Sequence, residues 1–341
     1  MPERGAPVRW STVARAYARQ ARASTLGRAE LLAELDRSQA QRGRPNHARR
    51  FEPERLEVGG PSLALEHLDP GDARATVVFS PGTNAYALLY ADFLVALAGR
   101  GFRVVGYDPR GHGRSGGARG SYTLPELVDD LDRVVRHVSR SIGGPIVVAG
   151  SSQGGIACFY YAARGAEVAA AICHNAADLA DPESFRLTRI PPRLSRRAAP
   201  ALRALARIAP ELPVPVTAYL DLAREPVRGL GDSRRALYTD RAIVPFVRLK
   251  TLASLSREPL ARPVEQIAVP ILLLHGGEDS IFPRDYIERL YDRLRCPKRL
   301  ALYEGLPHYL IVDHVEVFLD DVVRFLDEQL RAAVAAGGAA R

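Results

Sequence analysis

Short apolar runs alternate with helically spaced apolar positions along most of the chain. Six runs have the β-branched, nearly unbroken character of buried strands: 75–80, 102–108, 145–150, 168–174, 269–276 and 298–305. Two earlier strand-like runs, 51–57 and 62–68, flank a glycine-proline turn. Helical spacing of apolar residues follows at 86–99, from Thr123, from 153 and from about 314. This alternation predicts an α/β fold with an eight-stranded, mostly parallel sheet that starts antiparallel and is flanked by helices.

Three segments do not follow this rhythm. Residues 177–262 are rich in Pro and Arg and contain helical pieces but no convincing strand, so we expect a helical lid over the sheet's C-terminal edge. Residues 1–50 are expected to form a helical arm, and the Ala/Gly-rich residues 332–341 a flexible tail. The core of the fold is then expected in 51–176 and 263–331.

The arm contains two predicted helices. The first is amphipathic: an apolar face carries Trp10, Val13, Ala14, Tyr17 and Ala21, and the opposite face carries Arg15, Arg19 and Arg22. The second carries Leu31, Leu32 and Leu35. We expect the arm to dock on the body of the protein. In the alternative, its first helix lies on a membrane surface.

Charge is distributed unevenly. The arm has 11 Arg against 4 acidic residues and the lid has 16 Arg and Lys against 9, a net +7 each, whereas the remainder has 20 against 26. No nucleic-acid-binding motif accompanies the arginines, so no nucleic-acid partner is expected. Weak contact with an anionic membrane surface is one interpretation. The other is that arm and lid arginines pair with the acidic core.

Composition narrows the class of protein. Apolar residues are 47% of the 341 and charged residues 25%, as in ordinary globular proteins. No apolar run reaches the length of a membrane span, and no secretory signal follows the first methionine. The three cysteines lack metal spacing and suit free thiols. We therefore expect a cytoplasmic protein with neither metal nor organic cofactor, and composition leaves its oligomeric state open.

Two pentapeptides match the pattern Gly-x-Ser-x-Gly that surrounds nucleophilic serines. The match centred on Ser152 follows the predicted strand 145–150 and opens a helix, as a nucleophile elbow requires. The match centred on Ser115 sits in a glycine-rich turn, and the next helix begins only near Thr123. Ser152 is therefore the predicted nucleophile.

A serine hydroxyl needs a base, and the base needs an orienting acid. His308 follows the last predicted strand at the same sheet edge as Ser152 and is favoured as the base over His314. The acid should follow the strand 269–276, where Asp279 is favoured over Glu278 because a Ser-Ile-Phe-Pro turn follows it.

Backbone N–H groups should stabilise the developing oxyanion. We expect one donor at Gln153, at the start of the helix after the nucleophile, and one at Thr83, in the loop after the strand 75–80. Asn84 and His174 lie at the same edge and are candidate pocket residues. For His174, a buried residue whose hydrogen bonds are all made within the protein is an equally good interpretation.

With these residues placed, the chain resembles the α/β-hydrolase superfamily, in the branch of monoacylglycerol lipases, lysophospholipases and serine aminopeptidase-like hydrolases. The resemblance covers about 51–331 and rests on the Ser152 elbow and three further stretches: Asp108-Pro-Arg-Gly-His-Gly-Arg-Ser115, His275-Gly-Gly-Glu-Asp279 with Pro283, and Gly305-Leu-Pro-His308. It implies the α/β-hydrolase fold, the triad Ser152, Asp279 and His308, and a structural role for His112. Two features depart from the family: Pro81 stands where His is usual in the oxyanion loop, and the arm has no counterpart.

The function that this resemblance implies is hydrolysis of small carboxylic esters, such as an acylglycerol, a lysophospholipid or a similar lipophilic ester, through an acyl-enzyme on Ser152. Apolar lid residues are candidates for an acyl pocket: Phe185, Leu187, Leu202, Leu205, Ile208 and Tyr219. Thioesterase, peptidase and acyltransferase activities use the same triad and stay open. A non-catalytic binding protein on a hydrolase scaffold is the alternative of another class.

Overall fold

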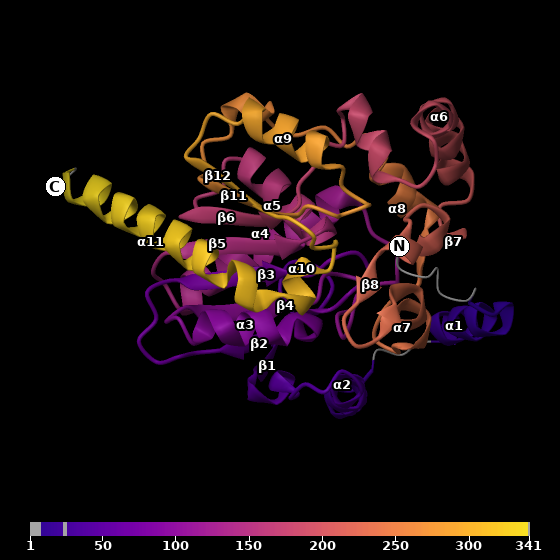
Figure 1. The fold of residues 1–341 in the computed structure, drawn as a ribbon, viewed down its shortest axis with the longest axis horizontal. Helices are drawn as coiled ribbons and strands as arrows, with labels where there is room; N and C mark the ends of the chain where they lie inside the picture. The colour runs from indigo at the N-terminus through magenta and orange to yellow at the C-terminus, as the bar shows by residue number, and fades with distance from the viewer. Residues whose placement is uncertain (1–7, 23–25, 340–341) are drawn as a thin grey trace.

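The structure is a computed structural model that describes residues 8–22 and 26–339 (Figure 1). Its strands are β1 (Glu52–Leu56), β2 (Leu63–Leu68), β3 (Thr76–Ser80), β4 (Arg103–Tyr107), β5 (Ile146–Ser151), β6 (Ala170–His174), β7 (Pro213–Pro215), β8 (Pro226–Val227), β9 (Gly231–Asp232), β10 (Phe246–Arg248), β11 (Ile271–Gly276) and β12 (Lys298–Tyr303). Its α-helices are α1 (Trp10–Arg22), α2 (Arg28–Gln41), α3 (Ala91–Ala98), α4 (Leu124–Ser141), α5 (Gln153–Ala163), α6 (Pro192–Ile208), α7 (Ser233–Thr239), α8 (Leu249–Ser254), α9 (Arg284–Arg293), α10 (Leu310–Asp313) and α11 (Val315–Ala339). Short 3-10 helices lie at His47–Arg50, Ala87–Tyr90, Pro182–Leu187, Val216–Ala218, Leu222–Arg224 and Val264–Gln266.

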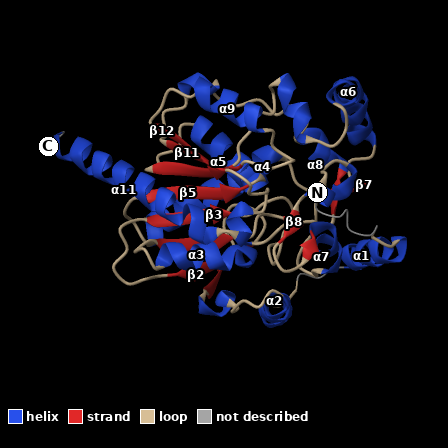
Figure 2. Ribbon diagram, viewed as in Figure 1, coloured by secondary structure: helices blue, strands red, loops and turns tan. Residues whose placement is uncertain are grey.

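The predicted eight-stranded sheet is confirmed. Its order is β1-β2-β4-β3-β5-β6-β11-β12 (Figure 2). The pairs β1–β2 and β2–β4 are antiparallel and all later pairs are parallel, so the antiparallel start is confirmed as well. The carboxyl ends of the parallel strands therefore meet at one edge of the sheet, where ligand sites of this architecture form.

Each face of the sheet is covered by helices because neighbouring residues of a buried strand point to opposite faces. Val78 of β3 packs in one apolar cluster with α4, α5 and α9, whereas its neighbours Val77 and Phe79 pack in the other with α3, α10 and α11. Leu31 and Leu35 of the arm join this second cluster. The core thus has two apolar layers, one on each side of the sheet.

The lid lies beyond the carboxyl ends of the parallel strands (Figure 1). Its content differs from the prediction, because it contains four short strands besides its helices. β7 pairs with β10 and β8 with β9, in two antiparallel two-stranded sheets. Each strand has only two or three residues, which is too short for an alternation of apolar and polar residues to be recognised in the sequence. Two of the four begin at a proline.

The arm docks on the body, and the covered face of α1 overlaps the predicted one only in part: Val13 packs against the core, and the ring of Tyr17 packs against that of Phe246. The buried residues of α1 are Ala16 and Gln20, while Trp10 is 86% exposed. Gln20 exchanges hydrogen bonds with the backbone of Phe246, and Arg19 donates to the carbonyl oxygen of Tyr238. The side chains of residues 21 and 22 lie outside the described part. Polar groups of the lid, available only after folding, therefore decide which side of α1 is covered.

At the other end of the chain, the predicted flexible tail is helical as far as Ala339, in the continuation of α11 that projects from the body (Figure 1). Residues 332–336 include four alanines, the residue with the highest helix propensity. Within the described residues, none of the helices combines the length and apolarity needed to cross a bilayer. The three cysteines are free thiols.

Candidate active site

Ser152 occupies the sharp turn between β5 and α5. Its φ of +53° and ψ of −116° lie in a region that side-chain-bearing residues rarely adopt. Glycines make room for this turn: a Cβ on Gly150 would lie less than 3.0 Å from the carbonyl oxygen of Gly154, and a Cβ on Gly154 equally close to that of Ser80. The pattern around Ser152 thus has a steric reason, and the packed surroundings keep the serine in this strained turn at the sheet edge.

The competing serine, Ser115, is part of the scaffold. Its hydroxyl donates to the carbonyl oxygen of Asp108 and accepts the N–H of Ala64 at 2.8 Å, and the residue is buried. His112 in the same turn is also buried, and its Nδ1 lies 2.8 Å from the carbonyl oxygen of Arg110. Burial lowers the pKa of His112 to about 4. Ser115 thus ties the turn to β2, and His112 holds the turn together from within.

Asp279 and His308 come together at the carboxyl ends of β11 and β12. The Nδ1 of His308 lies 2.7 Å from Oδ2 of Asp279. The other carboxylate oxygen accepts the backbone N–H groups of Ile281 and Phe282 at 2.8 and 2.9 Å. The backbone N–H groups of the Ser-Ile-Phe-Pro turn therefore fix the carboxylate of Asp279 by hydrogen bonds. With Nδ1 engaged, Nε2 is the ring atom of His308 left for proton transfer.

The other carboxylates that follow β6 and β11 are exposed or paired with an arginine. Glu278 is exposed, and its backbone N–H bonds to the carbonyl oxygen of Leu306. Asp178 and Asp181, which follow β6, both pair with Arg293, at 3.4 and 3.6 Å. His314, the alternative base, follows α10 and is only half-buried.

The charges of the pair stabilise each other. Burial opposes ionisation of Asp279, but the neighbouring imidazole of His308 and the N–H of Phe282 outweigh it and lower the pKa of this carboxyl well below its usual range. Burial also opposes protonation of His308, yet Asp279 and, more weakly, Glu225 raise its pKa. A histidine that gains a proton here is therefore held as imidazolium by the carboxylate.

Two residues that the sequence reasoning missed extend this pair inward. The side-chain amide of Asn175 donates to Oδ2 of Asp279 at 2.7 Å, and its oxygen lies 2.7 Å from Nδ1 of His275. All are buried, and Asn175 has a φ of +64°. Desolvation lowers the pKa of His275, so the ring stays neutral and can donate to Asn175. The position after β6, with a residue that tolerates positive φ, was the available signal for Asn175.

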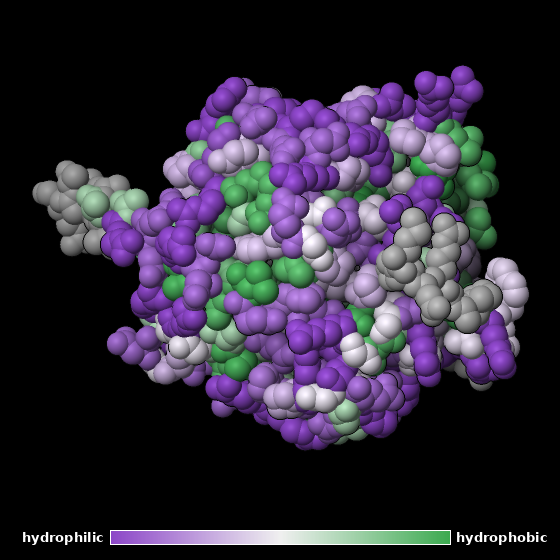
Figure 3. All heavy atoms as spheres, viewed as in Figure 1, coloured by the Kyte–Doolittle hydropathy of each residue, from purple (hydrophilic) through white to green (hydrophobic). Residues whose placement is uncertain are grey.

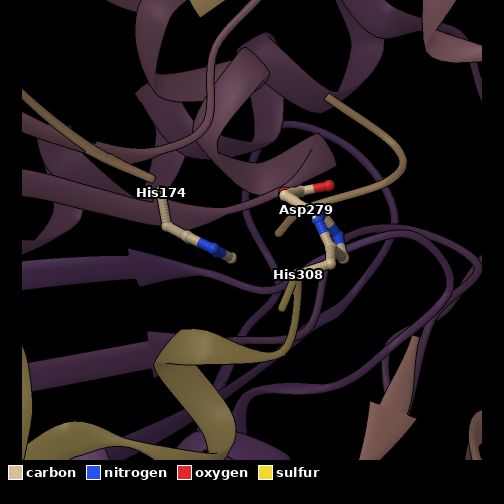
Figure 4. Close-up of side chains that lie close together, drawn as sticks. All are labelled: His174, Asp279 and His308. Carbon is tan, nitrogen blue, oxygen red and sulfur yellow. Dashed lines mark hydrogen bonds and ion pairs between the residues drawn. The ribbon is translucent and has the colours of Figure 1, made fainter. Parts of the chain in front are cut away.

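His174 lies beside the pair, and its ring points toward His308 (Figure 4). Its ring centroid is 5.5 Å from that of His308, and its Nδ1 is 3.0 Å from Oγ of Ser151. Burial, helped by the charge of His308, lowers its pKa to about 3. His174 is therefore neutral, it is absent from the lining of both cavities described below, and its Nε2 has no hydrogen-bond partner among the described residues.

His174, Asp279 and His308 are also the one group of potential metal ligands in the described part of the chain, with ligand atoms within 4.8 Å of one another. The four hydrogen bonds that Asp279 already accepts, from His308, Asn175, Ile281 and Phe282, use its carboxylate fully. A metal ion would have to displace His308, so the donor set fits a hydrogen-bonded pair better than a metal site.

The predicted oxyanion donors, Thr83 and Gln153, lie close to Ser152. Thr83 lines both cavities beside Ser152, and Gln153 begins α5. The backbone N–H groups of both lack a hydrogen-bond partner among the described residues, whereas that of Gly82 donates to the hydroxyl of Tyr90 at 3.0 Å. The N–H groups of Thr83 and Gln153 thus stay available for an anion.

Asn84, the other candidate pocket residue, is fully buried and is absent from the lining of both cavities. Its side chain donates to the carbonyl oxygen of Val244 and accepts the hydroxyl of Tyr122 at 2.8 Å. The same hydroxyl lies 3.2 Å from the side-chain oxygen of Gln153. Asn84 therefore fastens the lid to the oxyanion loop.

Two cavities meet at Ser152. The smaller, of about 240 Å³, is lined mainly by apolar side chains of the lid, including four of the predicted acyl-pocket residues: Phe185, Leu187, Leu202 and Tyr219. The prediction was wrong for Leu205 and Ile208, which are 46% and 82% exposed on the outer side of α6. The larger cavity, of about 520 Å³, has a more polar lining that includes His308.

Glu225 of the lid contacts the loops that carry Asp279 and His308. Although it is fully buried, its carboxylate accepts the backbone N–H of His308 and that of Ser280, both at 2.7 Å, and the hydroxyl of Ser280. Burial raises the pKa of Glu225. One lid carboxylate thus bridges the two loops that carry Asp279 and His308. Sequence reasoning missed it, because no local motif marks it.

A family model described as serine aminopeptidase, S33, matches residues 71–315, which is more than half of the chain. The chain belongs to this family. The resemblance to the α/β-hydrolase superfamily and its monoacylglycerol lipase-like branch is thereby confirmed. The family match begins after the arm, so the arm lies outside it.

Individual relatives agree. A monoacylglycerol lipase of Mycolicibacterium smegmatis is 26% identical over 80% of this chain and 95% of its own length. The crystal structure of the Paleococcus ferrophilus monoacylglycerol lipase shares the fold with a TM-score of 0.65 and 22% identity, covering 82% of this chain and 99% of that one. A soluble variant of the Saccharomyces cerevisiae monoglyceride lipase gives a TM-score of 0.66 at 18% identity, over 82% and 96% of the two chains.

Proposed function

We propose that the protein is a serine hydrolase that cleaves carboxylic esters through an acyl-enzyme on Ser152. The observation that carries the proposal is the buried Asp279–His308 pair, bonded at 2.7 Å, whose histidine lines the same cavity as a serine in a strained strand-to-helix turn. This arrangement supplies a nucleophile, a base and an orienting acid. The family match supports the same chemistry.

In the first half of the reaction, Oγ of Ser152 attacks the ester carbonyl while Nε2 of His308 takes the hydroxyl proton. The negative charge that develops on the carbonyl oxygen is stabilised by the N–H groups of Thr83 and Gln153, and the charge on His308 by Asp279. When the carbon–oxygen bond to the alcohol breaks, the leaving oxygen takes the proton from His308. The acyl group stays on Ser152.

In the second half, a water molecule replaces the alcohol. His308 takes a proton from the water as its oxygen attacks the acyl carbon, and returns that proton to Oγ of Ser152 when the acyl–serine bond breaks. The carboxylic acid then leaves, and the site is restored. A thioester, an amide or an acceptor alcohol would enter the same cycle, so thioesterase, peptidase and acyltransferase activities are the alternatives.

A lipophilic acyl group is the substrate feature that the cavities favour. The smaller cavity places leucine, isoleucine and phenylalanine side chains beside Ser152, as an aliphatic acyl chain requires. The monoacylglycerol lipases among the related proteins support an acylglycerol or a similar lipophilic ester. We expect this small-molecule substrate to be met in the cytoplasm.

The test is a set of p-nitrophenyl esters of rising acyl length, with an acyl thioester and an aminoacyl anilide as controls, combined with labelling by a fluorophosphonate probe. We expect hydrolysis of esters and labelling in the wild type and in Ser115→Ala, and neither in Ser152→Ala. Faster turnover of the thioester or anilide would shift the activity to that class. No turnover and no labelling of a folded wild type would support the non-catalytic binding protein.

A further inference from the structure

We propose that the N-terminal arm selects the leaving alcohol: helix α2 forms one wall of the larger cavity beside Ser152, and this cavity takes a polar alcohol bulkier than glycerol. The inference rests on the proposed function, because an alcohol site requires an acyl-enzyme chemistry at Ser152. The family match begins at residue 71 and does not include this wall.

The two cavities divide an ester between them. Both are lined by Ser152 and Thr83, so both open at the point where the ester carbonyl would react. The smaller cavity is apolar and suits the acyl chain. The larger one contains His308, which must deliver a proton to the leaving oxygen. The alcohol therefore belongs in the larger cavity.

One face of α2 supplies the arm's share of this cavity. Glu34, Arg37, Ser38, Gln41 and Arg42 all line it. Their spacing of three and four residues places them on the same side of a helix. Leu31 and Leu35 are buried in the core beneath the helix. The leucines in the first half of α2 hold the helix on the body, and the polar residues that follow them along the helix line the cavity.

The arm's wall is fixed relative to the catalytic base. Asp313, five residues after His308, forms a buried ion pair with Arg42 and accepts the backbone N–H of Arg228 in the lid at 2.7 Å. Nε of Arg42 donates to the carbonyl oxygen of Arg228 at 3.2 Å. Arm, lid and the segment after His308 therefore meet at one junction, which keeps the face of α2 in place beside the cavity.

The lid completes the polar wall. Arg235, Thr239 and Asp240 in and after α7 line the same cavity. Of these, Arg235 is exposed and has no ion pair among the described residues. Donors and acceptors thus line the side of the space formed by α2 and α7, as the hydroxyl groups of a polyol require, whereas apolar side chains such as Leu89, Val216 and Ile243 line other parts of it.

The size of the cavity sets the class of alcohol. If each non-hydrogen atom takes at most about 30 Å³, the share of a water molecule in the liquid, the six of glycerol fill less than about 180 Å³. The cavity holds about 520 Å³. A glycerol would leave most of it empty, so the cavity has room for a larger alcohol, and the face of α2 is one of the walls that such an alcohol would meet.

The experiment compares three octanoate esters with the same acyl group and different alcohols: methyl, glyceryl and maltosyl. Ser38→Trp and Gln41→Trp each fill the cavity from the arm. Ala40→Trp is the matched control, because Ala40 is exposed on the same helix and lies outside the lining. All three esters give the same acyl-enzyme, so any difference between them arises in acylation and leaves the deacylation rate unchanged.

We expect the wild type to hydrolyse the maltosyl ester with the highest kcat/KM. Ser38→Trp and Gln41→Trp should lower that value by about tenfold or more while methyl octanoate stays within about twofold. Ala40→Trp should behave as the wild type. Equal losses for all esters, no loss in either variant, or the same loss in Ala40→Trp would overturn the arm's role while leaving the hydrolase intact. A wild type inactive on every ester would overturn the proposed function, and the alcohol site with it.

Discussion

The carboxylate of Glu225, in the lid, accepts the backbone N–H of His308 at 2.7 Å. The same carboxylate holds Ser280, the residue after Asp279. Through Glu225, the lid therefore holds the loop of the proposed base in place and adds a negative charge beside it. The position of the lid and the protonation of His308 both depend on this one residue.

We predict that Glu225→Gln shifts the acidic limb of the kcat/KM profile to lower pH. His308 must be neutral to accept the serine proton, so activity falls as pH drops through its pKa. Glu225 helps to raise that pKa, and loss of its charge should lower it. The measurement is kcat/KM against pH with a short ester, and Glu278→Gln is the control. A limb that stays in place, with only a lower plateau, would show that Glu225 acts as a tether alone.

Asp279→Asn should reduce kcat by about 10³–10⁴, because an amide neither fixes the tautomer of His308 nor stabilises its charged form. Glu278→Gln should have little effect, since Glu278 is exposed. Steady-state kinetics on one p-nitrophenyl ester compares the two. If Glu278→Gln had the larger effect, Glu278 and not Asp279 would be the catalytic acid. Two mild effects would direct attention to Asp178 or Asp181.

The Arg42–Asp313 ion pair is predicted to be strongly coupled. The two side chains are 3% and 1% exposed, so Arg42→Met leaves a buried carboxylate without its main partner, a change that costs about 3–5 kcal/mol. Arg37→Met, in an arm pair whose arginine is 62% exposed, should cost less than about 1 kcal/mol. The double variant Arg42→Met/Asp313→Leu should recover most of the loss. Urea unfolding of Arg42→Met, Asp313→Leu and the double variant measures the coupling, with Arg37→Met as the exposed control, and a loss in the double variant equal to the sum of the two single losses would contradict it.

Contact with an anionic membrane is predicted to occur through α6 of the lid. Hydrophobic surface gathers over this helix (Figure 3), where Leu194, Leu205 and Ile208 are exposed. Arg203 and Arg207 have no ion pair in the described part of the structure, unlike the arm's Arg28 and Arg42. We expect co-sedimentation with anionic but not neutral vesicles, weakened by salt and by Ile208→Ser. Binding to neither vesicle would eliminate the membrane interpretation.

Much of this protein was determined by local sequence. The strands 75–80 and 145–150 could be located because a buried strand must be apolar throughout, and Ser152 could be preferred to Ser115 because a strand had to precede it and a helix had to follow. Asp279 and His308 were predicted from their places after strands whose carboxyl ends share an edge. These inferences use neighbours in the chain or the regular geometry of a parallel sheet.

Tertiary structure decided what distant segments do to one another. Asn175 bonds to Asp279, Glu225 of the lid bonds to the loops of the proposed triad, and Gln20 turns α1 toward Phe246. No periodicity or motif in the sequence predicts these contacts, because each joins polar groups that meet only when the chain has folded. The face of α2 that lines the larger cavity belongs to the same class. Local pattern determined the strands of the main sheet and the positions of the candidate triad residues along the chain, while burial of polar groups at long-range contacts determined the shape of the site.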